Sequence, residues 1–237
     1  MDLFLKRWLD LAAALFGLLI LALPLILVVL AIKTTSKGPV FYRGERVGRG
    51  GRMFRIFKFR TMIVNADRIG GSSTADDDPR ITRTGRFLRK FKLDELPQLL
   101  NVVAGDMSLV GPRPEVRQYV DLYTEEEKAI LTVRPGITDW ASLWNSDEGA
   151  LLAGADDPER VYLEKIRPQK IRLQLDYVRR RSFLVDLRIL FKTVWTVAAR
   201  GLGLPGGGAP ALDPAPARPA ATPADTAASE PVTRGHA

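Results

Sequence analysis

Two adjacent acidic residues, Asp94 and Glu95, stand in the middle of an apolar helical pattern and are followed by Pro97. A simple structural explanation is that Asp94 is the N-cap of a second helix. Pro97 would then lie in the first helical turn, where its missing N–H group leaves no hydrogen bond unmade. This interpretation explains the acids and the break, but not the charge of the neighbouring residues.

Basic residues surround the acid pair in the sequence. Cations around two carboxylates at a helix N-terminus suit phosphate groups together with a hard divalent metal ion. Each charge alone is typical of a solvated surface, whereas the combination predicts phosphoryl chemistry on an anionic substrate. The basic residues are Arg83, Arg86, Arg89, Lys90 and Lys92, then Arg113 in a rigid GPRP turn, with Lys58 and Arg60 on one face of an expected strand.

The composition excludes several kinds of enzyme. The chain has 237 residues, a formal net charge of +8 and 46% hydrophobic residues, enough for one domain with a core. It contains no Cys, and its single His is the penultimate residue, His236. A thiol nucleophile, a Ser-His-Asp triad and a Cys- or His-based zinc site are therefore excluded. The basic excess indicates an anionic partner, such as nucleic acid, a phosphorylated small molecule or anionic lipid.

The N-terminal segment is apolar from Leu11 to Ile32 and would be roughly 33 Å long as a helix, enough to cross a bilayer core of ~30 Å. One interpretation is an ordinary transmembrane helix. The other is a re-entrant helix, because Pro24 removes a hydrogen bond near the middle and bends the axis. Basic residues on both flanks favour two cytoplasmic ends. These residues are Lys6 and Arg7 before the segment, and Lys33, Lys37, Arg43 and Arg46 after it.

The remaining pattern predicts an α+β fold that is mostly helical. Strand-like residues on either side of Gly48–Gly51 predict a β-hairpin or two short strands, with Phe57 and Phe59 on one face of the second strand. Helical spacing over Thr84–Val103 predicts a helix that is broken at the acid pair. Further expected elements are a helix over 113–131, an extended loop over Val133–Trp144 stiffened by Pro135, and a charged helix over Asp157–Arg181 interrupted near Pro168.

The segment Leu184–Arg200 is strongly amphipathic, with a Leu/Phe/Trp stripe opposite a basic face. Such a helix suits a membrane interface, and packing on the protein core explains the pattern nearly as well. After Gly201 the chain is rich in Pro, Ala and Gly without periodicity, which predicts a disordered tail. The chain thus divides into a membrane anchor at 1–36, a domain at 37–201 that holds the acid pair, and a tail at 202–237.

The chain resembles the bacterial sugar transferase family, the monotopic polyprenyl-phosphate phosphoglycosyl transferases, in the motifs FKFRTM, DPRITRTGRFLRKFKLDELPQLLNVVAGDMSLVGPRPE and VRPGIT. The resemblance runs from about Met1 to Gly201. It implies transfer of a sugar-1-phosphate from a UDP-sugar to undecaprenyl phosphate, with Mg²⁺ as cofactor and a ping-pong route. The implied location is the cytoplasmic face of the bacterial inner membrane.

The resemblance also implies roles for individual residues. Asp94 would be the nucleophile that forms a covalent aspartyl phospho-sugar. Glu95 would be its essential acidic neighbour, assisting the metal or the proton balance. A carboxylate nucleophile needs no histidine to deprotonate it, which agrees with the composition. The family's phosphate-holding position corresponds to Arg89, and its site-lining positions correspond to Lys58, Arg113 and Arg134.

The fold that the resemblance implies has a re-entrant N-terminal membrane helix, a small β-hairpin and amphipathic interfacial helices around a cytosolic-face active site. The family's N-terminal helix is broken at a Ser-Pro pair, and this chain has Leu23-Pro24 at that place, so only the proline remains to bend it. Inner-membrane lipid is an implied partner, and a homodimer is left open.

Two other classes of protein are alternatives. A non-catalytic protein with basic faces bound to anionic lipid explains the N-terminal segment and Leu184–Arg200, but leaves the acid pair and the GPRP turn without a role. A nucleic-acid-binding protein fits the net charge, but the basic residues are not interleaved with exposed aromatic residues, and a membrane anchor argues against it. In an enzyme, the segment Asp139–Asp156 is a candidate for selecting the donor sugar.

Overall fold

The computed structural model describes residues 3–66, 69, 74–145 and 148–202. The predicted tail, apart from Leu202, lies outside these residues. Over the described range the chain is mostly helical with three small two-stranded sheets, which confirms the expected α+β class. The helices are α1 (Leu3–Ile20), α2 (Ala22–Thr35), α3 (Arg83–Lys90), α4 (Leu99–Ala104), α5 (Arg117–Val120), α6 (Trp140–Trp144), α7 (Glu148–Leu152), α8 (Pro158–Val161), α9 (Arg167–Arg180) and α10 (Phe183–Gly201).

The N-terminal apolar segment is a bent helix pair, with an angle of 62° between α1 and α2. Pro24 lies in the first turn of α2, and the chain breaks at Leu21, three residues before it. Pro24 lacks the N–H that would pair with the carbonyl of Ile20, and its ring crowds that carbonyl, so the helix cannot continue there. No single helix in the described part of the chain has the length and hydropathy to span a bilayer, although the bent pair does when taken together.

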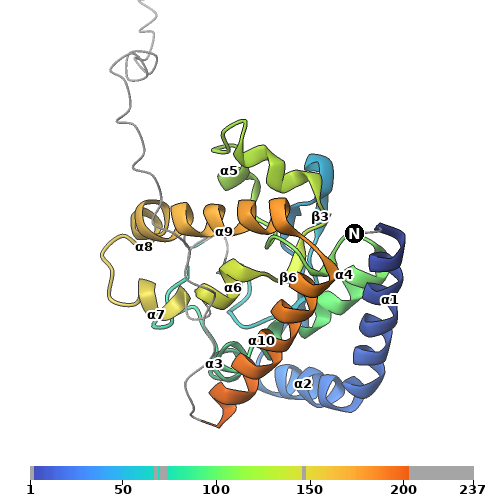
Figure 1. Ribbon diagram of the computed structural model, residues 1–237. Helices are drawn as coiled ribbons and strands as arrows, with labels where there is room; N and C mark the ends of the chain where they lie inside the picture. Colours follow the sequence, from blue (N-terminus) through green and yellow to red (C-terminus); the bar gives the residue numbers. More distant parts are fainter. Residues whose placement is uncertain (1–2, 67–68, 70–73, 146–147, 203–237) are drawn as a thin grey trace, which may run out of the picture.

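The concave side of this bend holds the segment that carries the acid pair. Helix α4 packs on α1. The side chain of Leu99 in α4 lies close to Gly17 in α1, since a Cβ atom added to this glycine would be 3.4 Å from it. Helix α3 packs on α2, and Thr84 Oγ1 donates to Thr35 Oγ1 over 2.9 Å. Figure 1 shows α1 along the right edge of the molecule and α2 along its lower edge, with α4 beside α1. The bend therefore positions α3 and α4 relative to each other.

The outward sides of α1, α2 and α10 are apolar and exposed. In α1 and α2, Leu19 is 75% exposed and Leu23 66%, whereas Ala14 and Ile32 are fully buried. In α10, Phe191 is 71% exposed, and the residues that pack on the core are those on its other side, such as Ile189. Most of the Leu/Phe/Trp stripe of α10 thus faces outward, namely Leu187, Phe191, Val194 and Trp195, whereas its Leu190 packs against the core. The interpretation of this stripe as mainly a core-packing face is therefore wrong.

The predicted β-hairpin is confirmed and is followed by a second pairing. Strands β2 (Glu45–Val47) and β3 (Met53–Arg55) pair antiparallel around a turn in which Gly50 and Gly51 have φ of 67° and 77°, values that favour glycine. Strand β4 (Lys58–Phe59) pairs antiparallel with β1 (Phe41–Tyr42). Phe57 and Phe59 both contact Phe41, at ring-centroid distances of 6.0 and 5.5 Å, so their rings lie on one side as predicted. Their expected place on the second strand of the hairpin is wrong, because that strand ends at Arg55.

The expected loop over Val133–Trp144 is instead a strand and a helix. Strand β6 (Gly136–Thr138) pairs in parallel with β5 (Ser108–Val110), and α6 follows it. The two strands approach so closely that a Cβ at Gly136 would lie 2.1 Å from the backbone nitrogen of Gly111. The predicted extended backbone is confirmed for residues 136–138, but no local pattern indicates the partner strand, since parallel pairing needs a distant segment.

The prediction of one continuous helix over 113–131 is wrong, because the helical segments there are short. Only the short α5 and a 3₁₀ turn at Glu127–Thr132 form there. Thr124 and Glu127 exchange hydrogen bonds in the manner of a capping box, which starts a new turn rather than extending α5. The interruption predicted near Pro168 is confirmed, since a π-helical stretch at Tyr162–Ile166 separates α8 from α9.

Candidate functional site

Asp94 lies in a 3₁₀ turn, Leu93–Gln98, between α3 and α4. Helix α3 begins at the N-cap Thr82, whose hydroxyl accepts from the Gly85 N–H over 2.9 Å. It ends just before Lys92, which has the left-handed φ of 55° and redirects the chain. The N-cap of the turn is Lys92 and not Asp94, so the capping interpretation of Asp94 is wrong. The predicted break at the acid pair is confirmed.

The Asp94 carboxylate is buried, with 1% of the residue exposed, and neither oxygen has a hydrogen-bond partner among the described residues. Its close neighbour is Lys58, whose Nζ lies 2.8 Å from Oδ2 in an ion pair without hydrogen-bond geometry. A buried carboxylate whose oxygens lack hydrogen bonds is unfavourable in a folded protein. Such a group at the centre of a cationic cluster indicates a site where a ligand or a reaction uses those oxygens.

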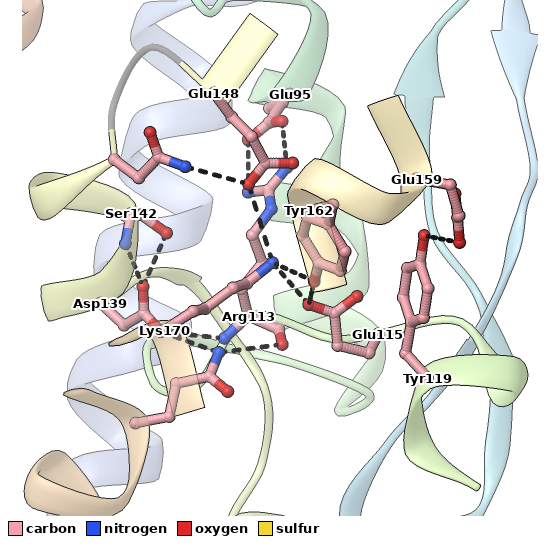
Figure 2. A network of polar contacts seen from close by, with 12 residues as sticks. Glu95, Arg113, Glu115, Tyr119, Asp139, Ser142, Glu148, Glu159, Tyr162 and Lys170 are labelled. Atoms are coloured by element: carbon pink, nitrogen blue, oxygen red, sulfur yellow. Dashed lines mark hydrogen bonds and ion pairs between the residues drawn. The ribbon is translucent and has the colours of Figure 1, made fainter. Parts of the chain in front are cut away.

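The Glu95 carboxylate, unlike that of Asp94, accepts hydrogen bonds. Oε2 accepts from Arg113 Nη1 over 2.8 Å, Oε1 accepts from Arg113 Nη2, and Lys58 Nζ lies 3.2 Å from Oε1. Figure 2 shows the guanidinium of Arg113 facing this carboxylate. Burial alone would raise the pKa of Glu95, but the charges of Arg113 and Lys58 outweigh it and hold that pKa well below its usual range. Glu95 is therefore ionised, and it raises the pKa of Arg113 in return.

Lys58 bridges the two carboxylates because β4 is fixed against the acid-pair segment. Asn101 in α4 makes this connection: its Oδ1 accepts from the Phe57 N–H over 2.7 Å, and its Nδ2 donates to the Arg55 carbonyl over 2.9 Å. Asn101 is fully buried, so both bonds are shielded from water. The strand pairing thus sets which side of β4 faces Asp94, and Lys58 lies on that side.

A further cation, Lys92, belongs to the same cluster. Burial lowers its pKa, and the nearby charges are Glu95 and Asp94, which oppose the shift, and Arg113 and Lys58, which add to it. The sequence placed Lys92 among the surrounding basic residues but did not single it out. Its left-handed backbone was not visible in the sequence, since lysine rarely adopts that conformation.

Two predicted site residues lie elsewhere. Arg134 Nε donates to the carbonyl of Gly105 over 3.1 Å, at the C-terminal end of α4, where Arg7 donates to the Val102 carbonyl over 2.7 Å. Arg89 lies on α3, and within the described residues its guanidinium has no hydrogen bond or ion pair. The structure thus brings together Asp94, Glu95, Lys58 and Arg113, but it does not join Arg89 or Arg134 to them.

The donor set of the site is two carboxylates. In the described part of the chain, no group of three or more acidic or His side chains is placed to hold a metal ion. Magnesium is usually held by one or two carboxylates together with phosphate oxygens of a substrate. The oxygens of Asp94, which have no hydrogen bonds, fit that pattern, whereas those of Glu95 are already paired with cations. Chemically, the cluster offers a carboxylate nucleophile beside cations that can bind phosphate.

Comparisons with known proteins place these residues in a family. The sequence model described as "Bacterial sugar transferase" matches residues 1–200. The UDP-N-acetylgalactosamine-undecaprenyl-phosphate N-acetylgalactosaminephosphotransferase of Aeromonas hydrophila is 38% identical over 199 residues, which cover 82% of this chain and 44% of that protein. The undecaprenyl-phosphate glucose phosphotransferase of Komagataeibacter xylinus is 42% identical over 200 residues, covering 81% of this chain and 36% of that protein.

A third relative is of similar length to this chain. The uncharacterized sugar transferase EpsL of Bacillus subtilis is 40% identical over 190 residues, which cover 80% of this chain and 85% of that protein. The chain therefore spans less than half of the first two relatives and most of the third. The family match covers the whole of the acid-pair segment, both helices of the bent pair and all of α10 except its last residue. The chain belongs to the bacterial sugar transferase family.

Proposed function

We propose that the chain transfers a sugar-1-phosphate from a UDP-sugar to undecaprenyl phosphate, with Asp94 as a covalent nucleophile. The activities for which the Aeromonas and Komagataeibacter relatives are named support this substrate class. The observation that carries the proposal is the Asp94 carboxylate, which is buried, has no hydrogen bonds and lies within a cluster of cations. A non-catalytic membrane-surface protein would have no use for such a group.

The proposed reaction has two steps. In the first, an Asp94 oxygen attacks the phosphorus that carries the sugar, and the bond from this phosphorus to the bridging oxygen of the diphosphate breaks. Uridine monophosphate leaves with that oxygen, and an aspartyl phospho-sugar remains. In the second, a phosphate oxygen of undecaprenyl phosphate attacks the same phosphorus and releases the Asp94 carboxylate. No histidine is required, because a carboxylate nucleophile needs no general base to deprotonate it.

The cations of the site perform the electrostatic work of phosphoryl transfer. Lys58 lies 2.8 Å from Asp94 and reduces the repulsion between that carboxylate and an incoming diphosphate. Arg113 has 31% of its side chain exposed while it is paired to Glu95, so it can also meet a substrate phosphate. Glu95 holds Arg113 and Lys58 in place through its two oxygens.

Magnesium is the proposed cofactor, and Asp94 and Glu95 are the residues that would hold it. When bound, the ion would neutralise charge on the diphosphate and stabilise the leaving uridine monophosphate. Glu95 would contribute an oxygen only by loosening its pairing with Arg113 or Lys58.

The apolar outer faces support a membrane location for this reaction. We propose that α1 and α2 enter one leaflet and return, and that α10 lies at the interface, at the cytoplasmic face of a bacterial inner membrane. The exposed residues Leu19, Leu23 and Phe191 would then contact lipid. The bend holds α3 and α4 on its concave side. In this arrangement Asp94 would lie beside the lipid phase in which the undecaprenyl acceptor dissolves.

The bent helix predicts that both of its ends are cytoplasmic. The chain has no native Cys, so single cysteines can be introduced at Leu3 and at Lys37 and labelled in intact cells with a membrane-impermeant maleimide. Neither should be labelled until the cells are opened, because re-entry returns the chain to the side from which it came. A cysteine at the exposed Asp121 serves as a cytoplasmic reference. Labelling of the Leu3 cysteine from outside, with the Asp121 cysteine protected, would establish a spanning helix.

The proposed activity is tested by a panel of donors. The purified protein in nanodiscs with undecaprenyl phosphate is incubated with UDP-glucose, UDP-galactose and their N-acetylated counterparts, and uridine monophosphate is measured. We expect release with at least one donor, and loss of release after chelation of Mg²⁺ with recovery on its return. Binding to anionic vesicles without release from any donor would favour the membrane-surface alternative.

A further inference from the structure

Asp139 is a fully buried carboxylate at the end of β6, and it connects two segments of the chain. Its Oδ1 accepts from the N–H and from the hydroxyl of Ser142, each over 2.7 Å. Its Oδ2 accepts from the backbone N–H of Arg113 over 3.1 Å and from Gln174 Nε2 over 3.2 Å. Figure 2 shows Asp139 between Ser142 and the main chain of Arg113. One oxygen therefore caps α6, and the other holds the GPRP turn.

The main chain of Arg113 is held from both sides. Its N–H donates to Asp139, and its carbonyl accepts from Gln174 Nε2 over 3.4 Å. Gln174 belongs to α9 and is also fully buried. The flanking residues of the turn pair with β6, since the Gly111 N–H donates to the Thr138 carbonyl over 3.1 Å and the Gly136 N–H donates to the Pro112 carbonyl over 2.9 Å. The turn is thereby fixed to the core.

These hydrogen bonds determine the position of the Arg113 Cα atom and the direction in which its side chain leaves the main chain. Proline on each side restricts the backbone of Arg113, so once its N–H and carbonyl are held, few directions remain for its side chain. Its guanidinium donates to Glu95, and this contact fixes the position of Glu95, the acid next to Asp94. A small displacement of the turn would move a charged group at the site, and misplacement by about 1 Å can reduce the rate by about a hundredfold.

We propose that Asp139 is a positioning residue for the transfer reaction, acting through the main chain of Arg113. The inference rests on the proposed function, in which Arg113 meets substrate phosphate and orients Glu95. It assigns a role to a residue that touches neither Asp94 nor Glu95. It also explains why a carboxylate occupies this position. Each of its two oxygens accepts from two donors, whereas a neutral side chain with one acceptor oxygen would leave one of these pairs of donors without a partner.

We call the hydrogen bonds of Asp139 and Gln174 to the Arg113 main chain the clamp. Hydrogen exchange at the Arg113 amide tests this clamp without a measurement of enzyme activity. Within Gly111–Glu115 only three residues carry an amide hydrogen, because two are prolines. In Asp139→Ala the Arg113 amide loses its acceptor, and its exchange should become about tenfold faster or more. Ser142→Ala is the matched control, because it removes a donor to Oδ1 only and should leave exchange at Arg113 unchanged. Unchanged exchange at Arg113 in the Asp139 variant would overturn the proposed clamp.

A double-mutant cycle with Arg113→Met separates positioning from general damage to the fold. Asp139→Ala should reduce kcat/KM for the donor by about thirtyfold in the wild-type background, and by less than about threefold when Arg113 is already replaced. Equal factors in the two backgrounds would overturn the proposal. If Asp139→Ala does not fold, Gln174→Met tests the same turn and should show a smaller reduction with the same dependence on Arg113. A wild type that releases no uridine monophosphate refutes the proposed function, and in that case the exchange measurement alone decides whether the clamp exists.

Discussion

Asp94→Asn is expected to reduce sugar-phosphate transfer by about a thousandfold or more while leaving the protein folded. The neutral amide has almost the size of the carboxylate, but it cannot attack phosphorus to form an acyl phosphate. The native carboxylate is buried and makes no hydrogen bonds, so the substitution breaks none. Lys58 keeps its contact with Glu95, so no cation is left unpaired. The free energy of unfolding should therefore change by only about 1 kcal/mol.

The covalent intermediate gives a second measurement of the same prediction. Wild-type protein incubated with radiolabelled UDP-sugar, and without lipid acceptor, should retain sugar-phosphate, and peptide mapping should place it on Asp94. The Asp94→Asn protein should retain none. Asp121→Asn is the matched control, because Asp121 is an exposed carboxylate paired with Arg117 and should behave as wild type. Substantial turnover by Asp94→Asn with an accepted donor would disprove the mechanism.

The features that could be predicted from the sequence are those with local causes. Pro24 breaks the N-terminal helix because the missing N–H affects the preceding turn, although the break itself lies at Leu21. The glycines at 50 and 51 turn the hairpin through their positive φ angles, and the acid pair marks the break between α3 and α4. Each of these signals lies within a few residues of the structure that it produces.

The features that could not be predicted depend on contacts between distant segments. The pairing of β6 with β5 joins residues more than 25 positions apart, and it brings Asp139 to the turn of Arg113. The position of Arg134 also depends on a distant contact. The family resemblance predicts Arg134 at the site, whereas in the structure its side chain donates to the Gly105 carbonyl at the C-terminal end of α4. The outward orientation of the α10 stripe was undecidable from periodicity, because a membrane-facing and a core-facing stripe have the same spacing.

Lys58→Met is expected to reduce both stability and transfer, and a second substitution should separate the two effects. Removal of Lys58 leaves Asp94 as a buried charge without its ion-pair partner, which should reduce the free energy of unfolding by about 2–4 kcal/mol. Transfer should fall by about a hundredfold or more, because the cation between the two carboxylates is gone. Denaturant unfolding in detergent micelles measures the first effect, and uridine monophosphate release the second.

In the double variant Lys58→Met/Asp94→Asn, most of the lost stability should return, because the buried charge has been neutralised together with its partner. Transfer should remain absent, since the nucleophile is missing. Lys128→Met is the matched control, because Lys128 pairs with the exposed Glu125 and its removal should change stability by about 0.5 kcal/mol or less. If the double variant is as unstable as Lys58→Met alone, the instability does not come from Asp94, and the ion pair is not the reason for Lys58 at this position. Recovery of stability without recovery of transfer would show that Asp94 is an unfavourable buried charge without Lys58, and that Lys58 lets the fold keep this carboxylate for its chemistry.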